Sequence, residues 1–531
     1  MFSSNSSPPA WMTMSPPSEP PTIPMLASKS PTAPPSSPTA SDTELDPIYI
    51  KALRKIRACR REGKGGTELS LNSLGLSQLP PEIGHLKALP RLDLSGNNLL
   101  CLPNEIGNVS SLSELILFGN QLQVLPPEIG RLKSLKSLDI SWNQLTALPP
   151  EIGELSSLKE LRLGNNLLTS IPSEIGHLKA LKLIILWNNR IGLLPPEISE
   201  LTRLKELRLA DNELVALPPE IGHLKALKSI ALWNNKIRTL PPEFGELTLL
   251  SRLHLSNNCL ITLPPQIGQL TALVELHVVK NNLANLPAEV GQLKSLKHLD
   301  LSHNKLTLLP PEVGLLTQLE TLNVSHNHLT AIPPEIGQLK SLKRLNLSHN
   351  HLTSLPSEIS QLPGLGSFDL SHNHLTTLPP DIGQLTALIY ISISHNGLIT
   401  LPPELGRLAT LSARAVDSLI NAGVENREQA LSALREGRLN PGHRPTKSKW
   451  KIYVELCKCL GISSEISPFA TLSTRAANAL LNMGIETREQ ALSALKEGRL
   501  TPGRHPRNYG WKSHIELCEW FGLPEPQKHP R

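Results

Sequence analysis

The sequence predicts an α/β protein in which a curved solenoid of short parallel strands is followed by small all-α domains. A pattern of 23 residues repeats without insertion through the middle of the chain, and leucines alternate with other residues at the same place in each repeat. A second repeat, with a period of 61 residues and helical patterning, fills the C-terminal region. Aromatic residues make up only 3% of the chain, which indicates a repeated aliphatic core and not one large mixed core.

Each unit of the 23-residue repeat reads L-x-L-x-x-N-x-L-x-x-L-P-x-E-I-G-x-L-x-x-L. The alternating leucines, Leu92 and Leu94 in one unit, predict a short strand with one face turned inward. The asparagine follows where the chain turns, and its amide can hydrogen-bond to backbone groups that leave the sheet. The E-I-G-x-L-x-x-L segment returns aliphatic side chains on the convex side. Since no unit can bury its apolar stripe alone, the units must stack.

The asparagine marks fourteen units, and one more unit precedes them with Leu74 in its place, giving fifteen units over residues 67–411. The asparagines are Asn97, Asn120, Asn143, Asn166, Asn189, Asn212, Asn235, Asn258, Asn281, Asn304, Asn327, Asn350, Asn373 and Asn396. Fifteen strands about 4.8 Å apart make a curved parallel sheet roughly 67 Å long. The units resemble the leucine-rich repeats of intracellular Ras-pathway scaffolds and their bacterial relatives. This resemblance implies a horseshoe-shaped solenoid whose concave face binds another protein.

Two segments precede the repeats. Residues 1–44 form a tail in which proline and serine fill half of the positions, so that it should be disordered; its PxxP spacings could instead dock an aromatic groove. Residues 45–66 hold an amphipathic helix, with Asp46 as its cap, Pro47 in its first turn and Gly63 at its end. Its basic face could lie on a membrane, but its place before the first unit favours an N-terminal cap of the solenoid.

Charge and cysteine usage restrict the class of protein. The formal net charge is +6, and all of the excess lies in residues 412–531, which hold 18 Lys and Arg against 12 Asp and Glu. The six cysteines have neither disulfide nor zinc-ligand spacing. There is no signal-peptide pattern and no apolar run that could cross a bilayer. These features predict a cytoplasmic protein with no membrane partner, no cofactor and no metal ligands.

Exposed positions of the predicted strands carry unusual side chains in the first half of the solenoid. The predicted protein-binding residues on the concave face are Phe118, Trp142, Arg162, Trp187, Arg208 and Trp233. Exposed tryptophans beside arginines are typical of the residues that dominate protein–protein binding energies. Tryptophan and arginine can also stack on bases, but the glutamates interleaved with them, Glu160 and Glu206, favour a protein partner.

Histidines occupy equivalent places in consecutive units of the second half. One column is His303, His326, His349, His372 and His395, and a shorter one is His328, His351 and His374. Strand spacing puts successive rings about 4.8 Å apart. Such columns could bind metal ions or form a pH-sensitive face. Because no carboxylate column or thiolate accompanies them, duplication of a Ser-His-Asn unit is the simpler interpretation.

The 61-residue repeat aligns Leu411–Leu419 with Leu472–Leu480 and Gly423 with Gly484. The second copy, residues 472–531, resembles the C-terminal domain of the bacterial RNA polymerase alpha subunit, a helix-hairpin-helix module. The resemblance implies that DNA or RNA polymerase is a partner of this copy. The residues that would contact nucleic acid are Arg475, Asn478, Gly510, Lys512 and Ser513. Arginine and asparagine three residues apart share a helical face, and glycine lets backbone amides approach a phosphate.

The first copy, residues 412–461, departs from this resemblance. Asp417 stands in place of the asparagine, Lys449 in place of the glycine and Ile452 in place of the serine. A carboxylate beside a phosphate is unfavourable. We therefore predict that the first copy is a C-terminal cap of the solenoid and that a linker, residues 462–471, connects it to the second.

Two functions follow from these patterns. The first is a non-enzymatic protein-binding scaffold or adaptor that uses the concave face. The alternative is a transcription-linked adaptor whose C-terminal module binds DNA or RNA polymerase. An enzyme is a distant third hypothesis, because no Walker loop, H-E-x-x-H, G-x-S-x-G or kinase signature is present and no catalytic residues are predicted.

Overall fold

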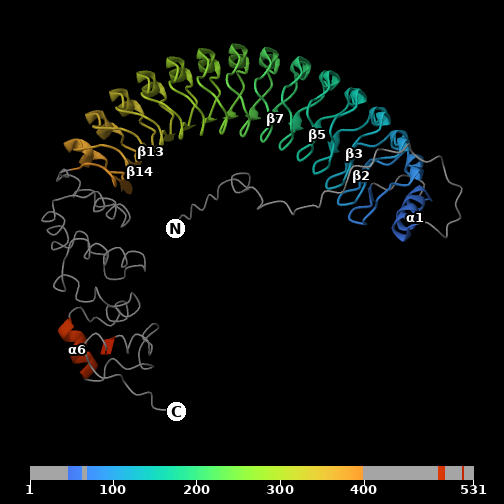
Figure 1. Ribbon diagram of the computed structural model, residues 1–531, viewed down its shortest axis with the longest axis horizontal. Coiled ribbons are helices and arrows are strands. Elements are labelled where there is room, and N and C mark those ends of the chain that lie inside the picture. The colour runs from blue at the N-terminus through green and yellow to red at the C-terminus, as the bar shows by residue number, and fades with distance from the viewer. Residues whose placement is uncertain (1–45, 62–67, 399–487, 497–516, 519–531) are drawn as a thin grey trace, which may run out of the picture. The chain divides into compact units, whose positions relative to one another are not determined.

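Fifteen short strands form one parallel sheet along the inner side of a curved solenoid (Figure 1). The computed structural model describes residues 46–61, 68–398, 488–496 and 517–518. The strands follow chain order, and each pairs with the next at a shift of one unit, as Leu115 does with Leu138. The predicted solenoid of fifteen parallel strands is confirmed.

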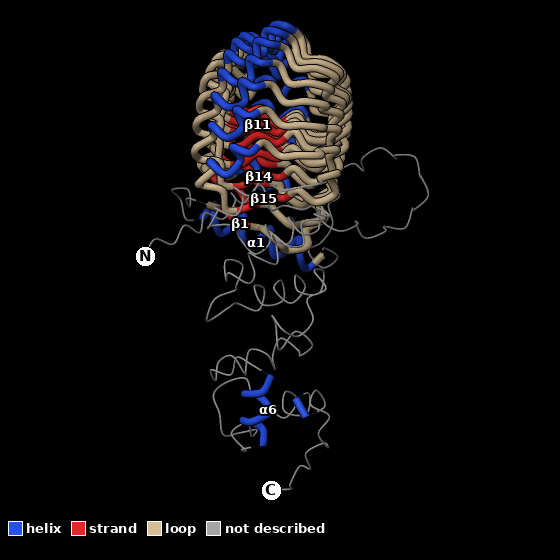
Figure 2. The backbone as a smooth tube through the Cα atoms, turned by 90° about the vertical axis from the view of Figure 1, so that its left-hand side faces the viewer, coloured by secondary structure: helices blue, strands red, loops and turns tan. Residues whose placement is uncertain are grey.

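All strands but the first span three residues. They are β1 (Leu69–Ser70), β2 (Arg91–Asp93), β3 (Glu114–Ile116), β4 (Ser137–Asp139), β5 (Glu160–Arg162), β6 (Leu183–Ile185), β7 (Glu206–Arg208), β8 (Ser229–Ala231), β9 (Arg252–His254), β10 (Glu275–His277), β11 (His298–Asp300), β12 (Thr321–Asn323), β13 (Arg344–Asn346), β14 (Ser367–Asp369) and β15 (Tyr390–Ser392). Figure 2 shows the units following one another in register, with the strands aligned in one column.

On the convex side, fourteen units carry a five-residue 3-10 helix. These are η1 (Pro81–His85), η2 (Asn104–Asn108), η3 (Pro127–Arg131), η4 (Pro150–Glu154), η5 (Ser173–His177), η6 (Pro196–Glu200), η7 (Pro219–His223), η8 (Pro242–Glu246), η9 (Pro265–Gln269), η10 (Ala288–Gln292), η11 (Pro311–Leu315), η12 (Pro334–Gln338), η13 (Ser357–Gln361) and η14 (Pro380–Gln384). A proline precedes each helix and sets the extended backbone from which it starts, as Pro126 does with φ −68° and ψ 145°.

The glycine of the E-I-G segment lets neighbouring 3-10 helices pack closely. A Cβ atom on Gly130 would lie 2.6 Å from the carbonyl oxygen of Glu151 in the next unit. Such a contact would force the two helices apart. Glycine, which has no side chain, allows them to pack closely here. The isoleucine beside it, Ile129, is fully buried. Serine stands at this place in η6 and η13, so the glycine favours the close stacking of most units and is not required in every one.

Between the sheet and the 3-10 helices lies a continuous aliphatic core. In one unit it contains Leu138, Ile140, Leu145, Ile152 and Leu158, each with 0% exposure. Every buried leucine side chain of this kind contributes roughly 1.5–3 kcal/mol relative to leaving it in water. Because the core has no interruption between units, the solenoid is held by contacts between neighbours along its whole length.

The repeated asparagine binds three backbone groups at the end of the strand, and two of them are carbonyl oxygens that it shares with the asparagine of a neighbouring unit. The Nδ2 of Asn143 donates to the carbonyl oxygens of Leu117, at 2.9 Å, and Ile140, at 3.0 Å. Its Oδ1 accepts from the backbone N–H of Leu122 at 2.9 Å. Equivalent bonds recur at Asn350 near the other end of the stack. The predicted role of the asparagine at the end of the strand is confirmed.

The residue before each asparagine has a left-handed backbone, which the sequence analysis did not predict. Its φ is 58° at Trp142 and 56° at His303, and glycine occupies the place at Gly96 and Gly119. Bulky side chains are disfavoured in this region. The turn imposes the conformation, because the N–H of Trp142 must point at the carbonyl oxygen of Gly164, 2.8 Å away in the next unit.

Helix α1 (Pro47–Arg61) packs on the first unit. It begins at Pro47, as the sequence predicts, and buries Ala52, Leu53 and Ile56, while Gly63 lies outside the described residues. Two residues of its basic face bind the first unit. Lys55 donates to the carbonyl oxygen of Ser70 at 3.1 Å, and Arg57 lies 3.8 Å from Glu82. Among the described residues, no helix is both long and apolar enough to cross a membrane.

Little of the C-terminal region is described. Helix α6 (Arg488–Lys496) lies in the second helical copy, and it buries Ala491 and Ala494. The tail, the first helical copy, the linker and most of the second copy lie outside the described residues. The predicted resemblance to the polymerase subunit therefore remains a prediction.

Candidate protein-binding surface

Four aromatic side chains follow the strands at the concave edge of the first half of the solenoid. Phe118, Trp187 and Trp233 each lie two residues after the end of their strand, and Trp142 lies three residues after. The exposed fractions of Phe118, Trp142 and Trp233 are 44%, 47% and 38%. Trp187 is half-buried. Large aromatic surfaces therefore remain in contact with water on this face.

Three of these residues form an aromatic cluster, defined here as Phe118, Trp142 and Trp187. The ring centroids of Phe118 and Trp142 are 6.5 Å apart with their planes inclined by 59°. Those of Trp142 and Trp187 are 6.3 Å apart in an edge-to-face arrangement. Such tilted pairs are favourable because the positive edge of one ring meets the negative face of another. Trp233 stands two units beyond Trp187, so the six predicted residues do not form one continuous group.

Gly164 makes the contact between the two tryptophans possible. It lies in the unit between Trp142 and Trp187, and a Cβ atom on it would meet Nε1 of Trp187 at 2.6 Å. The indole of Trp187 therefore rests directly on the backbone of the preceding unit. Gly164 was not predicted from the sequence, although glycine stands there where many other units have serine.

The aromatic residues replace a hydrogen bond that other units use. There an aspartate or asparagine at the strand end accepts the backbone N–H of a serine two residues later, as in Asp300 and Ser302 at 3.0 Å. The pairs are Asp93–Ser95, Asp139–Ser141, Asp300–Ser302, Asn323–Ser325, Asn346–Ser348 and Asp369–Ser371. The aromatic units carry Ile116 with Phe118, Ile185 with Trp187 and Ala231 with Trp233 at these two places. An aliphatic side chain accepts no hydrogen bond, so these units forgo about 1 kcal/mol each.

The two predicted arginines are held by glutamates of their own strands. Arg162 donates to Glu160 on β5 at 2.7 Å, and the guanidinium of Arg208 lies 2.6 Å from Glu206 on β7. Strand β6 lies between them and presents aliphatic side chains in the equivalent places. These are Leu183 and Ile185. The surface below Trp187 is therefore an apolar strip bordered by two ion pairs.

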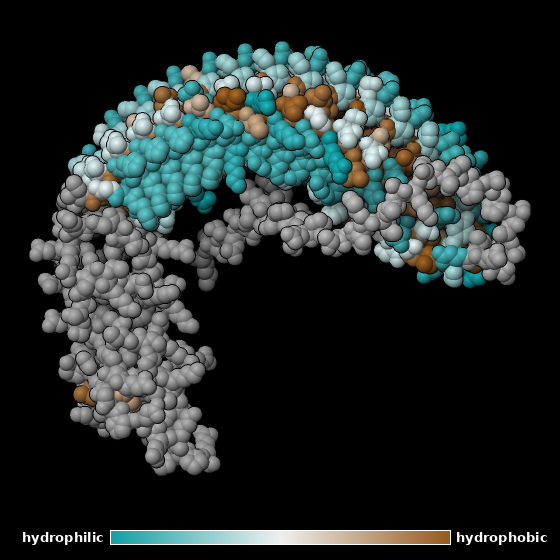
Figure 3. All heavy atoms as spheres, viewed as in Figure 1, coloured by the Kyte–Doolittle hydropathy of each residue, from teal (hydrophilic) through white to brown (hydrophobic). Residues whose placement is uncertain are grey.

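The first histidine column forms a stacked ladder, called the histidine ladder below. It consists of His303, His326, His349, His372 and His395. Successive ring centroids are 4.0–4.1 Å apart and their planes are within 12° of parallel. Figure 3 shows hydrophilic residues along the inner edge of the arc toward the C-terminal end of the solenoid. Burial and the neighbouring imidazoles lower the pKa of both His326 and His372.

Parallel stacking makes the ladder unsuited to sharing a metal ion between neighbouring rings. An imidazole binds a metal through a nitrogen lone pair in the plane of the ring. In parallel planes 4.0 Å apart, as for His326 and His349, these lone pairs run side by side and do not converge. The second column is more widely spaced, with 5.5 Å between the rings of His328 and His351.

A further group of titratable residues, which the sequence analysis did not identify, lies between the two halves. It consists of His254 on β9 with Glu275 and His277 on β10, and is called the histidine–glutamate cluster below. His277 pairs with His254 in the sheet, and Glu275 is two residues before His277 on the same face. The signal in the sequence was a strand of the form x-L-H in two consecutive units, Arg-Leu-His and Glu-Leu-His.

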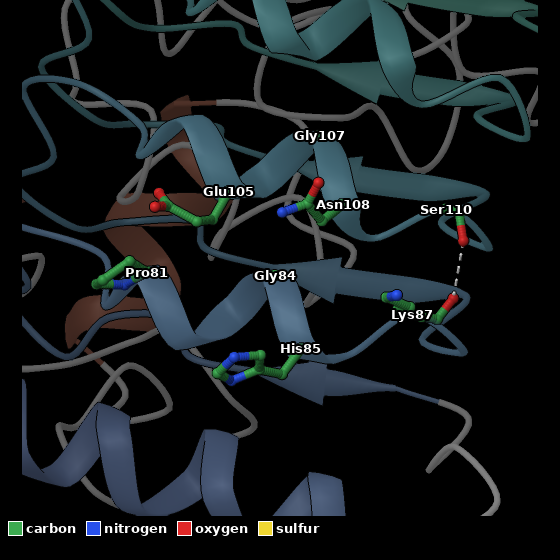
Figure 4. A pocket seen from close by; sticks show the side chains of 8 residues that line it. All are labelled: Pro81, Gly84, His85, Lys87, Glu105, Gly107, Asn108 and Ser110. Atoms are coloured by element: carbon green, nitrogen blue, oxygen red, sulfur yellow. Dashed lines mark hydrogen bonds between the residues drawn. The ribbon is translucent and has the colours of Figure 1, made fainter.

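A pocket on the convex side, between η1 and η2, does not involve any of these residues (Figure 4). Its lining includes Gly84, Gly107 and Asn108. Across it the hydroxyl of Ser110 donates to the backbone carbonyl of Lys87 at 3.5 Å. These residues belong to the stacking contacts that recur between units, so we assign no function to this pocket.

The predicted nucleic-acid contacts all lie outside the described residues. They are Arg475, Asn478, Gly510, Lys512 and Ser513. Their arrangement is a prediction from the sequence alone.

Comparisons with known proteins identify repeats of the same kind. A family profile described as Leucine rich repeat matches residues 133–191, 271–314 and 317–375, and one described as Leucine-rich repeat region matches residues 196–283. A leucine-rich-repeat protein of Leptospira interrogans is 40% identical, with 68% of this chain and 97% of that chain covered and a TM-score of 0.58. The search of curated proteins returned no match.

Two other solved structures are more distant. The plant peptide hormone receptor RGFR1, in complex with RGF2, is 31% identical over 65% of this chain and 66% of that chain, with a TM-score of 0.52. An internalin of Listeria monocytogenes is 22% identical over 67% of this chain and 99% of that chain, with a TM-score of 0.50. The likeness to the internalin is one of fold alone.

Proposed function

Because the chain belongs to the leucine-rich-repeat proteins, we propose that it is a protein-binding scaffold whose concave surface holds a partner over the aromatic cluster. The observation that carries this proposal is that the units of Phe118 and Trp187 give up a structural hydrogen bond, which the unit of Trp142 keeps as Asp139–Ser141. Ile185 and Trp187 stand where Asp300 and Ser302 form such a bond in another unit. The aromatic side chains therefore do not serve the fold at these positions.

The chemistry of the surface favours a partner with an apolar segment flanked by polar groups. Phe118 and Trp142 expose nearly half of their surface, and covering such a side chain contributes about 1.5–3 kcal/mol. On either side, Glu160–Arg162 and Glu206–Arg208 offer both signs of charge to the rim of an interface. The related receptor RGFR1 is in complex with RGF2, which supports a peptide or protein as the kind of ligand.

Photo-crosslinking tests this proposal and identifies the partner. A photoreactive phenylalanine at position 118 is irradiated in the cells that make the protein, and the same residue at the exposed position 249 serves as a control. We expect a protein that is captured at 118 and not at 249, since Leu249 is 52% exposed but lies away from the cluster. The captured protein is then purified and its dissociation constant measured.

The dissociation constants of variants test whether the aromatic cluster is the binding site. We expect Trp187→Ala to weaken binding by about thirtyfold, equivalent to roughly 2 kcal/mol, and Leu249→Ala to leave it unchanged. Equal affinities of the wild type and Trp187→Ala would refute the aromatic cluster as the site.

The second candidate function concerns the C-terminal module. The excess of basic residues in 412–531 and the Arg475/Asn478 pair favour DNA as an additional ligand. Fluorescence anisotropy of the full chain on AT-rich duplex DNA, titrated against salt, tests it. Binding that weakens steeply with salt and fails in Arg475→Ala/Asn478→Ala would support the adaptor hypothesis. A lack of binding at low salt would eliminate it.

A further inference from the structure

The histidine–glutamate cluster places three metal-binding side chains on neighbouring strands. The nitrogen atoms of His254 and His277 and the carboxylate of Glu275 lie within 4.8 Å of one another. His254 and His277 are directly paired in the sheet, and Glu275 lies diagonally across from His254. All three side chains are half-buried at the concave face. They occupy three corners of one cell of the sheet, and Arg252, which pairs with Glu275, occupies the fourth.

One oxygen of the Glu275 carboxylate has no hydrogen-bond partner in the part of the chain that the structure describes. Its Oε2 atom is buried and accepts no hydrogen bond from the described residues. Nε2 of His254 lies 3.7 Å from it, which is beyond hydrogen-bonding distance. A buried carboxylate oxygen without a donor costs free energy, so the site accommodates an additional positive group at this point.

The two imidazoles are suited to donate lone pairs. Their rings are stacked with centroids 4.7 Å apart, but their planes are inclined by 30°, against at most 12° in the histidine ladder. An imidazole binds a metal ion in its neutral form, through the nitrogen lone pair in the plane of the ring.

The charged residues around the cluster include both a positive and a negative side chain. Arg252 and His298 flank Glu275 on the two neighbouring strands, and Asp300 flanks His277. The Oδ1 of Asp300 accepts hydrogen bonds from Ser302. Asp300 is thus held in place by its own unit, and its negative charge beside His277 compensates for the positive charge of Arg252.

We propose that His254, Glu275 and His277 bind a divalent metal ion, with Zn²⁺ as the best match. Two imidazole nitrogens and one carboxylate oxygen are ligands that zinc favours, and three protein ligands leave a further position open on the concave side. A tetrahedral ion needs its ligand atoms roughly 3.3 Å apart. The present separations are at most 4.8 Å, and we expect side-chain rotation to close the remaining distance when the ion binds. Water or a side chain of a bound protein fills the open position.

Metal titration of the purified full chain tests the proposal. Zn²⁺ alone is titrated by calorimetry, and Co²⁺ is followed by its visible absorption, which reports coordination geometry. We expect the wild type to bind one equivalent more tightly than the background from its other histidines. This equivalent should be lost in His254→Ala and in His277→Ala, and weakened about tenfold or more in Glu275→Gln.

The matched control is His349→Ala, which removes a histidine from the middle of the ladder at the same concave face. We expect it to keep the tight equivalent and the cobalt spectrum. Circular dichroism of each variant shows that it is folded, and the melting temperature should rise with Zn²⁺ only where the cluster is intact. The proposal is overturned if no tight equivalent exists, or if His349→Ala removes it while His254→Ala does not.

Discussion

The two halves of the concave surface share one backbone and differ in what they display. Both halves contain the repeated asparagine, a residue with left-handed backbone before it, and the buried leucines. The second half keeps the Asp–Ser hydrogen bond and repeats histidine at the left-handed position, as in Asp369, Ser371 and His372. The first half abandons the hydrogen bond at Phe118 and Trp187. The comparison shows that the proposed binding surface lies where the units depart from the repeated pattern.

Removing the shared asparagine tests whether the two halves rest on the same structural support. Asn143→Ala and Asn350→Ala each leave one buried backbone N–H, that of Leu122 or Leu329, without its side-chain acceptor. We expect both to lower the free energy of unfolding by about 2 kcal/mol. Urea denaturation measures it, with Asn98→Ala, an exposed residue, as the control. A large difference between the two variants would show that the halves are supported differently.

Filling the space below Trp187 tests the geometry of the aromatic half. Gly164→Ser adds a side chain where a Cβ atom would meet the indole at 2.6 Å. We expect the indole to move off the backbone and partner binding to weaken about tenfold, equivalent to roughly 1.4 kcal/mol, with a small change in stability. Gly192→Ser is the control, since a Cβ atom there meets nothing within 4 Å. Unchanged affinity in Gly164→Ser would mean that the position of Trp187 is unimportant.

Placing glycine at the left-handed position of Trp142 distinguishes an effect on stability from an effect on partner binding. Trp142 has φ 58°, a conformation that glycine adopts without strain. We expect Trp142→Gly to change the free energy of unfolding by less than about 1 kcal/mol, because relief of backbone strain offsets the lost ring contacts. Binding of the partner should nevertheless fall. Thermal denaturation and calorimetry on the same sample distinguish the two effects, and a strongly destabilised variant would assign Trp142 a structural role.

Removing one ring from the histidine ladder tests how its members titrate. His349 lies between His326 and His372 and lowers the pKa of both, after the larger effect of burial. We expect His349→Ser to raise both values toward the ordinary 6.5. NMR of histidine-labelled protein measures them, and His351→Ser in the second column is the control. Unmoved values would show that the stacked rings do not interact electrostatically.

The direction of the linked stability follows from these depressed values. Because His326 and His372 have lowered pKa values in the folded chain, the unfolded chain binds protons first as the pH falls below 6.5. Their contribution to stability is therefore complete above this pH and is lost as the pH falls through the folded values. Removing His349 raises the folded pKa values toward 6.5. It therefore narrows the pH range, between 6.5 and the folded values, over which this contribution to stability is lost.

Sequence alone determined the repeated scaffold. Alternating leucines such as Leu92 and Leu94, the asparagine at one place and a constant period suffice to predict fifteen parallel strands, because each unit can bury its apolar face only against identical neighbours. The same regularity gave the place of the concave aromatic residues. The histidine ladder could also be predicted from the sequence, because its residues occupy the same position in consecutive units.

Only the tertiary structure decided which side chains meet. Trp142 reaches Trp187 two units away because Gly164 has no side chain. The Oε2 atom of Glu275 has no hydrogen bond among the described residues, and its neighbour His298 on β11 bonds instead to Thr321. The left-handed backbone at Trp142 arises from a hydrogen bond to the next unit and not from the preference of tryptophan. These features depend on contacts between units and on side-chain rotamers, whereas a periodic pattern specifies only the position of each residue within its own unit.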